Sequence, residues 1–159
     1  MSIVWEKQHC GVHLAPYEKV LELMPDLSEI LKTFPDLHSN FTWDVKVHML
    51  MPNQFPCVPN WHVDNVPRIN GIQHFDLIKE LPMYMWISGA PLIQFKHGFL
   101  QAGRWHRFNQ TDEHRGTPAS EFCWRGFIRA THKAIIPAKL VDHQRRHCQV
   151  YLDADSYQW

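Results

Sequence analysis

From residue 40 onward the sequence consists of short runs of β-forming residues, and this pattern constrains the fold more than any other feature of the chain. Pro, Gly and Asn separate the runs, as they separate the strands of small all-β domains. Helical segments do not alternate with the runs, so a parallel βαβ sheet is disfavoured and an antiparallel sandwich or barrel is favoured. The predicted strands are Phe41–Met51, Trp61–Val66, Tyr84–Ser88, Leu92–Phe95, Phe99–Phe108, Phe122–Thr131 and Gln149–Leu152.

The first run shows the alternation of a half-buried strand. Val45 and Val47 alternate with Lys46 and His48. Because successive side chains of a strand point to opposite faces, this pattern predicts one apolar face against a core and one polar face toward solvent.

One helical segment is predicted ahead of the strands, between Pro16 and Thr33. Its apolar residues recur at spacings of three to four, which is the period of one helix face. Pro25 falls inside the segment and cannot donate a helical hydrogen bond, so we expect a kink or two short helices, the second starting near Asp26 or Ser28. Residues 1–40 are therefore predicted to form a helical cover and residues 41–159 a β core, within one domain of 159 residues.

The amino-acid composition argues against some classes of binding partner. The chain has 16 Lys and Arg against 16 Asp and Glu, and this balance argues against bulk nucleic-acid binding or attachment to an anionic membrane. The longest apolar stretch, Leu81–Phe95, is broken by prolines and a glycine and is too short to cross a bilayer. The first ten residues lack the pattern of a secretory signal, and the four cysteines are widely spaced, so we expect a cytoplasmic protein.

The sharpest local feature is the segment His62-Val63-Asp64. On a strand, residues two apart point to the same face, so His62 and Asp64 are expected to project side by side. An imidazole and a carboxylate are two of the three ligands of a 2-His-1-carboxylate site, which leaves open positions on the metal. The third ligand is predicted to be a histidine on a later strand, and His106 lies on the predicted strand Phe99–Phe108.

Arginines downstream of His106 are candidates for holding an anionic ligand. A carboxylate co-substrate bound to a metal needs a fixed cation at its far end, and the planar guanidinium suits this role. Arg125 and Arg129 lie on one face of the same predicted strand, where two arginines would need anionic partners if buried. Arg115 lies in the polar segment Asn109–Ser120, which is predicted to be a loop. We prefer Arg125 as the anion ligand, with Arg129 as support.

With these residues the sequence resembles the Fe(II)/2-oxoglutarate-dependent dioxygenases, whose fold is the double-stranded β-helix, a jelly-roll or cupin-like barrel. The resemblance extends from Val45 to Thr131 and lies in Met51-Pro52-Asn53, His62-Val63-Asp64, Trp105-His106-Arg107 and Trp124-Arg125-Gly126-Phe127-Ile128-Arg129. It implies that His62, Asp64 and His106 bind Fe(II) and that Arg125 grips the C5 carboxylate of 2-oxoglutarate. The interval from His106 to Arg125 is longer than usual for the family, so either residues 109–120 are an inserted loop or Arg115 takes this role.

The resemblance implies an oxygenase that hydroxylates or otherwise oxidises a small or nucleotide-like substrate. Two other functions are compatible with the same residues. A non-oxidative hydrolase or isomerase on a cupin-like barrel would use His62, Asp64 and His106 to hold Zn, Mn or Ni. A non-catalytic jelly-roll would use its arginines and aromatic side chains to bind an anionic small molecule.

Overall fold

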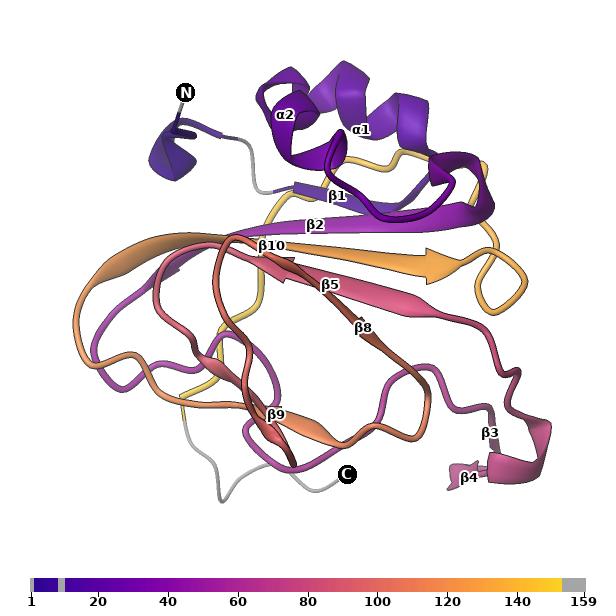
Figure 1. Cartoon of the computed structure of the whole chain (residues 1–159). Coiled ribbons are helices and arrows are strands. Elements are labelled where there is room, and N and C mark those ends of the chain that lie inside the picture. The colour runs from indigo at the N-terminus through magenta and orange to yellow at the C-terminus, as the bar shows by residue number, and fades with distance from the viewer. Residues whose placement is uncertain (1, 9–10, 153–159) are drawn as a thin grey trace.

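The structure is a computed structural model that describes residues 2–8 and 11–152, and it is mainly β (Figure 1). The helices are α1 (Tyr17–Leu23) and α2 (Ser28–Leu31), and 3-10 turns occur at Trp5–Lys7, Pro25–Leu27, His38–Asn40 and Phe75–Leu77. The strands are β1 (Gly11–Ala15), β2 (Phe41–Leu50), β3 (Arg68–Ile69), β4 (Ile72–Gln73), β5 (Met83–Ile87), β6 (Ile93–Phe95), β7 (Gly98–Phe99), β8 (Trp105–Phe108), β9 (His114–Gly116) and β10 (Cys123–His132).

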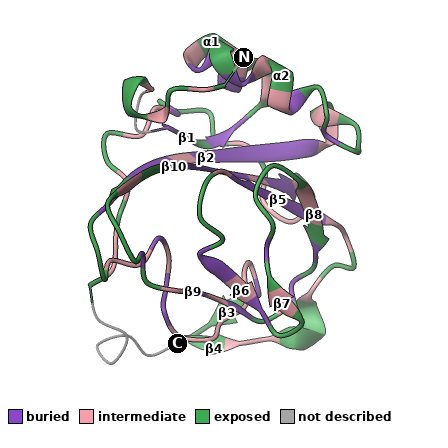
Figure 2. Cartoon of the chain, turned by 60° about the vertical axis from the view of Figure 1, so that its left-hand side comes forward, coloured by how far each residue is buried: buried purple, intermediate pink, exposed green. Residues whose placement is uncertain are grey.

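The strands form two antiparallel sheets and one short hairpin. The larger sheet has the order β1-β2-β10-β5-β8, the smaller sheet has the order β7-β6-β9, and β3 pairs with β4. The helices cover one face of the larger sheet, and the smaller sheet lies on the side of its other face (Figure 2). Within the described residues the strands do not close into one barrel. The expectation of a mainly β, antiparallel fold is therefore confirmed, and that of a single closed barrel is not.

The N-terminal helical segment breaks at the proline, as predicted. The first helix ends at Leu23, Pro25 begins a 3-10 turn, and the second helix begins at Ser28. In residues 2–8 and 11–152, no helix has the length and apolarity needed to cross a membrane.

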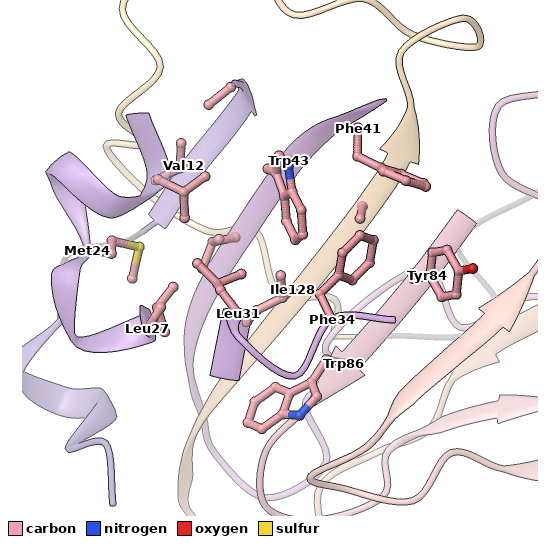
Figure 3. Packing of buried hydrophobic residues seen from close by; sticks show 14 of the residues in the cluster. Val12, Met24, Leu27, Leu31, Phe34, Phe41, Trp43, Tyr84, Trp86 and Ile128 are labelled. Carbon is pink, nitrogen blue, oxygen red and sulfur yellow. The ribbon is translucent and has the colours of Figure 1, made fainter. Parts of the chain in front are cut away.

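The apolar side of this helical segment packs on the larger sheet (Figure 3). Leu27 and Leu31 are completely buried there. Phe34, just after α2, lies edge-on to four aromatic rings at centroid distances between 4.8 and 5.1 Å, namely Phe41, Trp43, Tyr84 and Trp105. Edge-on aromatic pairs stabilise a core beyond the area they bury, so this cluster fixes the helices on the sheet.

Both faces of β2 are covered, and the prediction of one face toward solvent is wrong. Val45 and Val47 belong to the hydrophobic cluster beneath the helices. Lys46 and His48 alternate with them and therefore point to the opposite face, toward the smaller sheet, where His48 is buried. The polar residues of this strand face the interior, and their charges need partners there.

Several predicted segments differ from the structure. Trp61–Val66 forms one bridge within the described residues, at His62, and bends at residues 64–65. Phe99–Phe108 is split by a turn into β7 and β8, and Gln149–Leu152 also forms only a single bridge. The polar segment 109–120, predicted to be a loop, contains β9. This short strand has the largest consequence, because it carries a histidine to His62.

Replacing Leu31 by Ala tests the attachment of the helical cover. Leu31 is 0% exposed, so the truncation leaves a cavity between α2 and the sheet, and we expect the free energy of unfolding to fall by about 2–5 kcal/mol. Leu37 is 60% exposed, and Leu37→Ala should change it by less than about 0.5 kcal/mol. Urea denaturation of both variants measures the difference. Equal, small effects would contradict the packing described above.

Candidate metal centre

Two histidines and one aspartate meet between the larger and the smaller sheet. Their candidate ligand atoms, from His62, Asp64 and His114, all lie within 4.8 Å of one another. Nε2 of His62 is 3.8 Å from Oδ1 of Asp64, and Nε2 of His114 is 3.5 Å from Oδ2 of Asp64. All three side chains are largely buried.

Backbone pairing places the two histidines opposite each other. His62 and His114 form an antiparallel bridge in which each amide nitrogen donates to the other residue's carbonyl oxygen, at 3.0 and 2.9 Å. Asp64 follows His62 by two residues, at the start of a bend, and its carboxylate lies beside both imidazoles. The spacing of the three side chains is thus fixed by the backbone.

Each imidazole is oriented by the carbonyl two residues before it. Nδ1 of His62 lies 2.8 Å from the carbonyl oxygen of Asn60, and Nδ1 of His114 lies 3.1 Å from that of Asp112. A carbonyl only accepts, so each Nδ1 carries a hydrogen and donates it, and Nε2 is the nitrogen directed toward Asp64. Histidines that bind metals are commonly held in this way.

The carboxylate of Asp64 is held in its ionised form. Burial raises the pKa of Asp64, but the Arg129 guanidinium and the two histidines more than offset this, so the pKa lies well below its usual range. Burial and the neighbouring His114 lower the pKa of His62. Burial also lowers the pKa of His114, but Asp64 outweighs it and raises that pKa overall. Asp64 is therefore an anion at neutral pH, as a metal ligand must be.

The three groups fit a divalent transition metal. Two imidazole nitrogens and one carboxylate oxygen suit Fe(II), Mn, Co or Zn, and a set of three protein ligands leaves coordination positions for other molecules. The group also lines a cavity of about 330 Å³. Lys46, Met85 and Phe127, from the larger sheet, lie on its wall. The third histidine is the one part of this set that the sequence alone does not identify.

His106, the predicted third ligand, lies outside this group. It is on β8, where its Nε2 is 2.9 Å from the carbonyl oxygen of Gln101. In the register of the larger sheet, Met85 lies between His106 and Arg129. His106 is therefore two strands, or about 10 Å, from Arg129, which contacts Asp64. The structure brings His114 to the predicted pair instead, because β9 belongs to the smaller sheet.

The three predicted arginines have different surroundings. Arg129 bridges two carboxylates, with Nη1 2.8 Å from Asp64 and Nη2 3.2 Å from Asp44. Arg115 is adjacent to His114 on β9 and therefore points to the other face, where its Nε donates to Gln94 at 2.9 Å. Arg129 thus contacts a predicted metal ligand directly, and Arg115 turns away from it.

Arg125 is buried without a hydrogen-bond partner. It is 1% exposed, and none of its three guanidinium nitrogens has a partner among the described residues. It shares a face of β10 with Phe127 and Arg129, which both line the cavity. Burial lowers the pKa of Arg125, although an arginine remains charged at any ordinary pH. A buried cation without a partner is costly, so this position favours an anionic ligand.

Lys46 is a second cation that the sequence analysis does not single out. Its ammonium lies 5.6 Å from the centre of the Phe127 ring. No carboxylate of residues 2–8 or 11–152 lies within ion-pair distance of it. Burial, together with Arg129 and Arg145, lowers the pKa of Lys46. The alternation of residues along β2 places Lys46 on the polar face of this strand. The sequence analysis would have singled out Lys46 only by assigning that face to the protein interior.

Comparison of the chain with models of protein families, with curated proteins and with solved structures finds no match. The function therefore has to be inferred from the site. Its chemistry is two imidazoles and a carboxylate beside a cavity, with buried positive charge close by.

Replacing Arg125 by Met tests whether this cation lacks a partner. The methionine fills similar volume without a buried charge, so the ligand-free protein should become more stable, by roughly 1–3 kcal/mol. Arg129→Met is the matched control, and it should destabilise the protein because it leaves Asp44 and Asp64 without their shared cation. Denaturation at neutral pH measures both. A loss of stability in Arg125→Met would show that its charge is satisfied.

The buried His48 predicts a pH dependence of stability. Burial, followed by Arg125 and Lys46, lowers the pKa of His48 to about 3. The pKa of a histidine in the unfolded chain is about 6.5, so between these values only the unfolded chain binds the proton. Unfolding should therefore become easier as the pH falls below 6.5, by up to about 1.4 kcal/mol per pH unit from this group.

The measurement compares unfolding free energies at pH 6.5 and 4.5, above the range where the ion-paired aspartates titrate. His48→Asn should remove this part of the slope, whereas replacing the exposed His97 by Asn should leave it unchanged. An unchanged slope in His48→Asn would mean that His48 is protonated in the folded protein.

Proposed function

We propose that this protein is a non-haem Fe(II)- and 2-oxoglutarate-dependent oxygenase that oxidises a small-molecule substrate. The observation that carries the proposal is the meeting of His62, Asp64 and His114 at a cavity, with the guanidinium of Arg125, which is buried and unpartnered within the described residues, on the same face of β10 as the cavity-lining Phe127. Two antiparallel sheets on either side of the site are consistent with a jelly-roll form of the fold.

The assignment of His114 in place of His106 also fits the order of the chain. The family resemblance requires an arginine-bearing strand soon after the distal histidine, and His106 is separated from Arg125 by a long interval. That interval contains β9, so the strand with Arg125 follows directly after the strand with His114. No inserted loop and no role for Arg115 is then needed.

The two ends of 2-oxoglutarate have matching groups on the chain. In this proposal the 2-oxo acid end lies at the metal held by His62, Asp64 and His114. The far carboxylate would be held by Arg125, which is buried, and by Lys46, which is half-buried; neither cation has a carboxylate partner within the described residues. When bound, Fe(II) and 2-oxoglutarate supply oxygen activation, in which O₂ is consumed, 2-oxoglutarate becomes succinate and CO₂, and the substrate gains one oxygen atom.

The remaining residues of the cavity position ligands and exclude water. Met85, Ile93 and Phe127 provide apolar walls. Arg145 and Tyr151, from the C-terminal segment, line the cavity from another side. Enclosure of this kind protects a reactive centre from solvent, because a dry site strengthens the electrostatic contacts inside it.

Anaerobic titration of the protein with Fe(II) and 2-oxoglutarate tests the proposal. A chelate of the two gives a visible charge-transfer band, which we expect in the parent protein. His62→Ala and His114→Ala should lose the band because each removes one metal ligand. His106→Ala is the matched control and should keep it, since His106 lies two strands away from Arg129.

The possible outcomes separate the three functions. Bound metal without a band would favour the non-oxidative metalloenzyme, and 2-oxoglutarate binding without metal would favour the non-catalytic binding protein. Loss of the band in His106→Ala with retention in His114→Ala would contradict the assignment of the third ligand.

A further inference from the structure

The two oxygens of the Asp64 carboxylate have different surroundings. Oδ2 accepts a hydrogen bond from Nη1 of Arg129 at 2.8 Å. Oδ2 also lies 3.5 Å from Nε2 of His114. Oδ1 faces Nε2 of His62 at 3.8 Å, and within the described part of the chain no arginine donates a hydrogen bond to it. Each oxygen thus faces one of the two histidines, and only Oδ2 is also engaged by a cation.

Arg129 cannot easily leave this position, because a second carboxylate holds its other side. Nη2 of Arg129 is 3.2 Å from Oδ2 of Asp44, and its Nε has no hydrogen-bond partner among residues 2–8 and 11–152. The orientation of the guanidinium therefore depends on the two carboxylates.

Asp44 is itself fixed. It is 1% exposed, and its Oδ1 accepts from the amide of Leu14 at 3.1 Å and from Nη2 of Arg145 at 3.1 Å. Nδ1 of His13 is also 3.0 Å from this oxygen. Contacts from β1 and from the C-terminal segment thus anchor the carboxylate that orients Arg129.

We propose that Arg129 is a positioning residue that keeps Asp64 a ligand through one oxygen only. This inference rests on the proposed function. A carboxylate can bind a metal through one oxygen or through both. A second oxygen on the metal would occupy a position that 2-oxoglutarate or O₂ needs, since the three protein ligands must leave the other positions open. By engaging Oδ2, Arg129 preserves those positions.

Removal of Arg129 should therefore affect the affinity for the metal and the affinity for 2-oxoglutarate differently. A cation close to the site repels a divalent metal, and its loss also frees a second carboxylate oxygen, so the metal should bind as tightly as before or more tightly. 2-Oxoglutarate should bind more weakly, because fewer positions are open. General damage to the site would weaken the binding of both, so this split distinguishes positioning from structural support.

The test uses the double variant Asp44→Asn/Arg129→Met. It removes one negative and one positive charge together, so no buried aspartate at position 44 loses its cation. The side-chain oxygen of the asparagine can still accept the hydrogen bond from the Leu14 amide. Arg129→Lys is the second variant, since it keeps a cation near Asp64 without the two-sided guanidinium. Arg146→Met is the control, because Arg146 is exposed and pairs with Asp142.

Cobalt(II) is the metal probe, and its visible absorption reports both affinity and coordination. We expect the double variant to bind Co²⁺ at least as tightly as the parent, with a changed absorption spectrum. We expect its Co²⁺-loaded form to bind 2-oxoglutarate roughly 10–100-fold more weakly. Arg129→Lys should recover part of the affinity for 2-oxoglutarate, and Arg146→Met should match the parent.

Two results would overturn the inference. One is an affinity for 2-oxoglutarate within about twofold of the parent, and the other is a parallel loss of Co²⁺ and 2-oxoglutarate binding with an unchanged spectrum. A parent protein that binds no Co²⁺ would overturn the proposed function itself, and the positioning role with it.

Discussion

The guanidinium of Arg129, shared between two buried carboxylates, is the interaction on which the rest of the site depends. Asp44 comes from β2, Arg129 from β10, and Asp64 from a segment that has only one backbone bridge to a strand. The ion pairs therefore attach an irregular segment to the most extensively paired part of the larger sheet. Because a buried charge is expensive unless it is paired, each of the three groups stabilises the position of the others.

The two faces of the larger sheet differ in composition. Its face beneath α1 and α2 is apolar and aromatic, and it holds the hydrophobic cluster around Phe34 and Trp43. Its other face carries a second hydrophobic cluster, which includes Met83, Met85, Ile87 and Phe127. Beside this cluster lie the charged residues Asp44, Lys46, Arg125 and Arg129. Charged groups in this interior are tolerable because the two clusters supply the hydrophobic stabilisation. The unsatisfied polar atoms of Arg125 and His48 lie on this second face, which also carries the candidate metal centre, and residues at binding sites commonly sacrifice stability for binding.

The sequence patterns correctly predicted those helices and strands whose positions depend on neighbouring residues in the chain. Pro25 ended the first helix because it lacks an amide hydrogen, and the long strands β2, β5 and β10 had clear β-forming runs. The pair His62 and Asp64 followed from its spacing. The third histidine could not be found in this way, because it lies on β9, which is only three residues long. A single backbone bridge links it to His62, which is far away in the sequence. The alternation in β2 was equally ambiguous, since a polar face buried against a binding site has the same pattern as one exposed to solvent.

The backbone bridge between His62 and His114 has a consequence for how such a protein can diverge. Two hydrogen bonds set the separation of the imidazoles, whatever the chain does between them. That intervening chain includes the β3–β4 hairpin, whose residues Arg68 and Gln73 line the cavity. Evolution can lengthen, shorten or recompose the hairpin without moving either histidine. The lining of the cavity can therefore change among descendants of this chain while the geometry of the two candidate ligands is inherited intact.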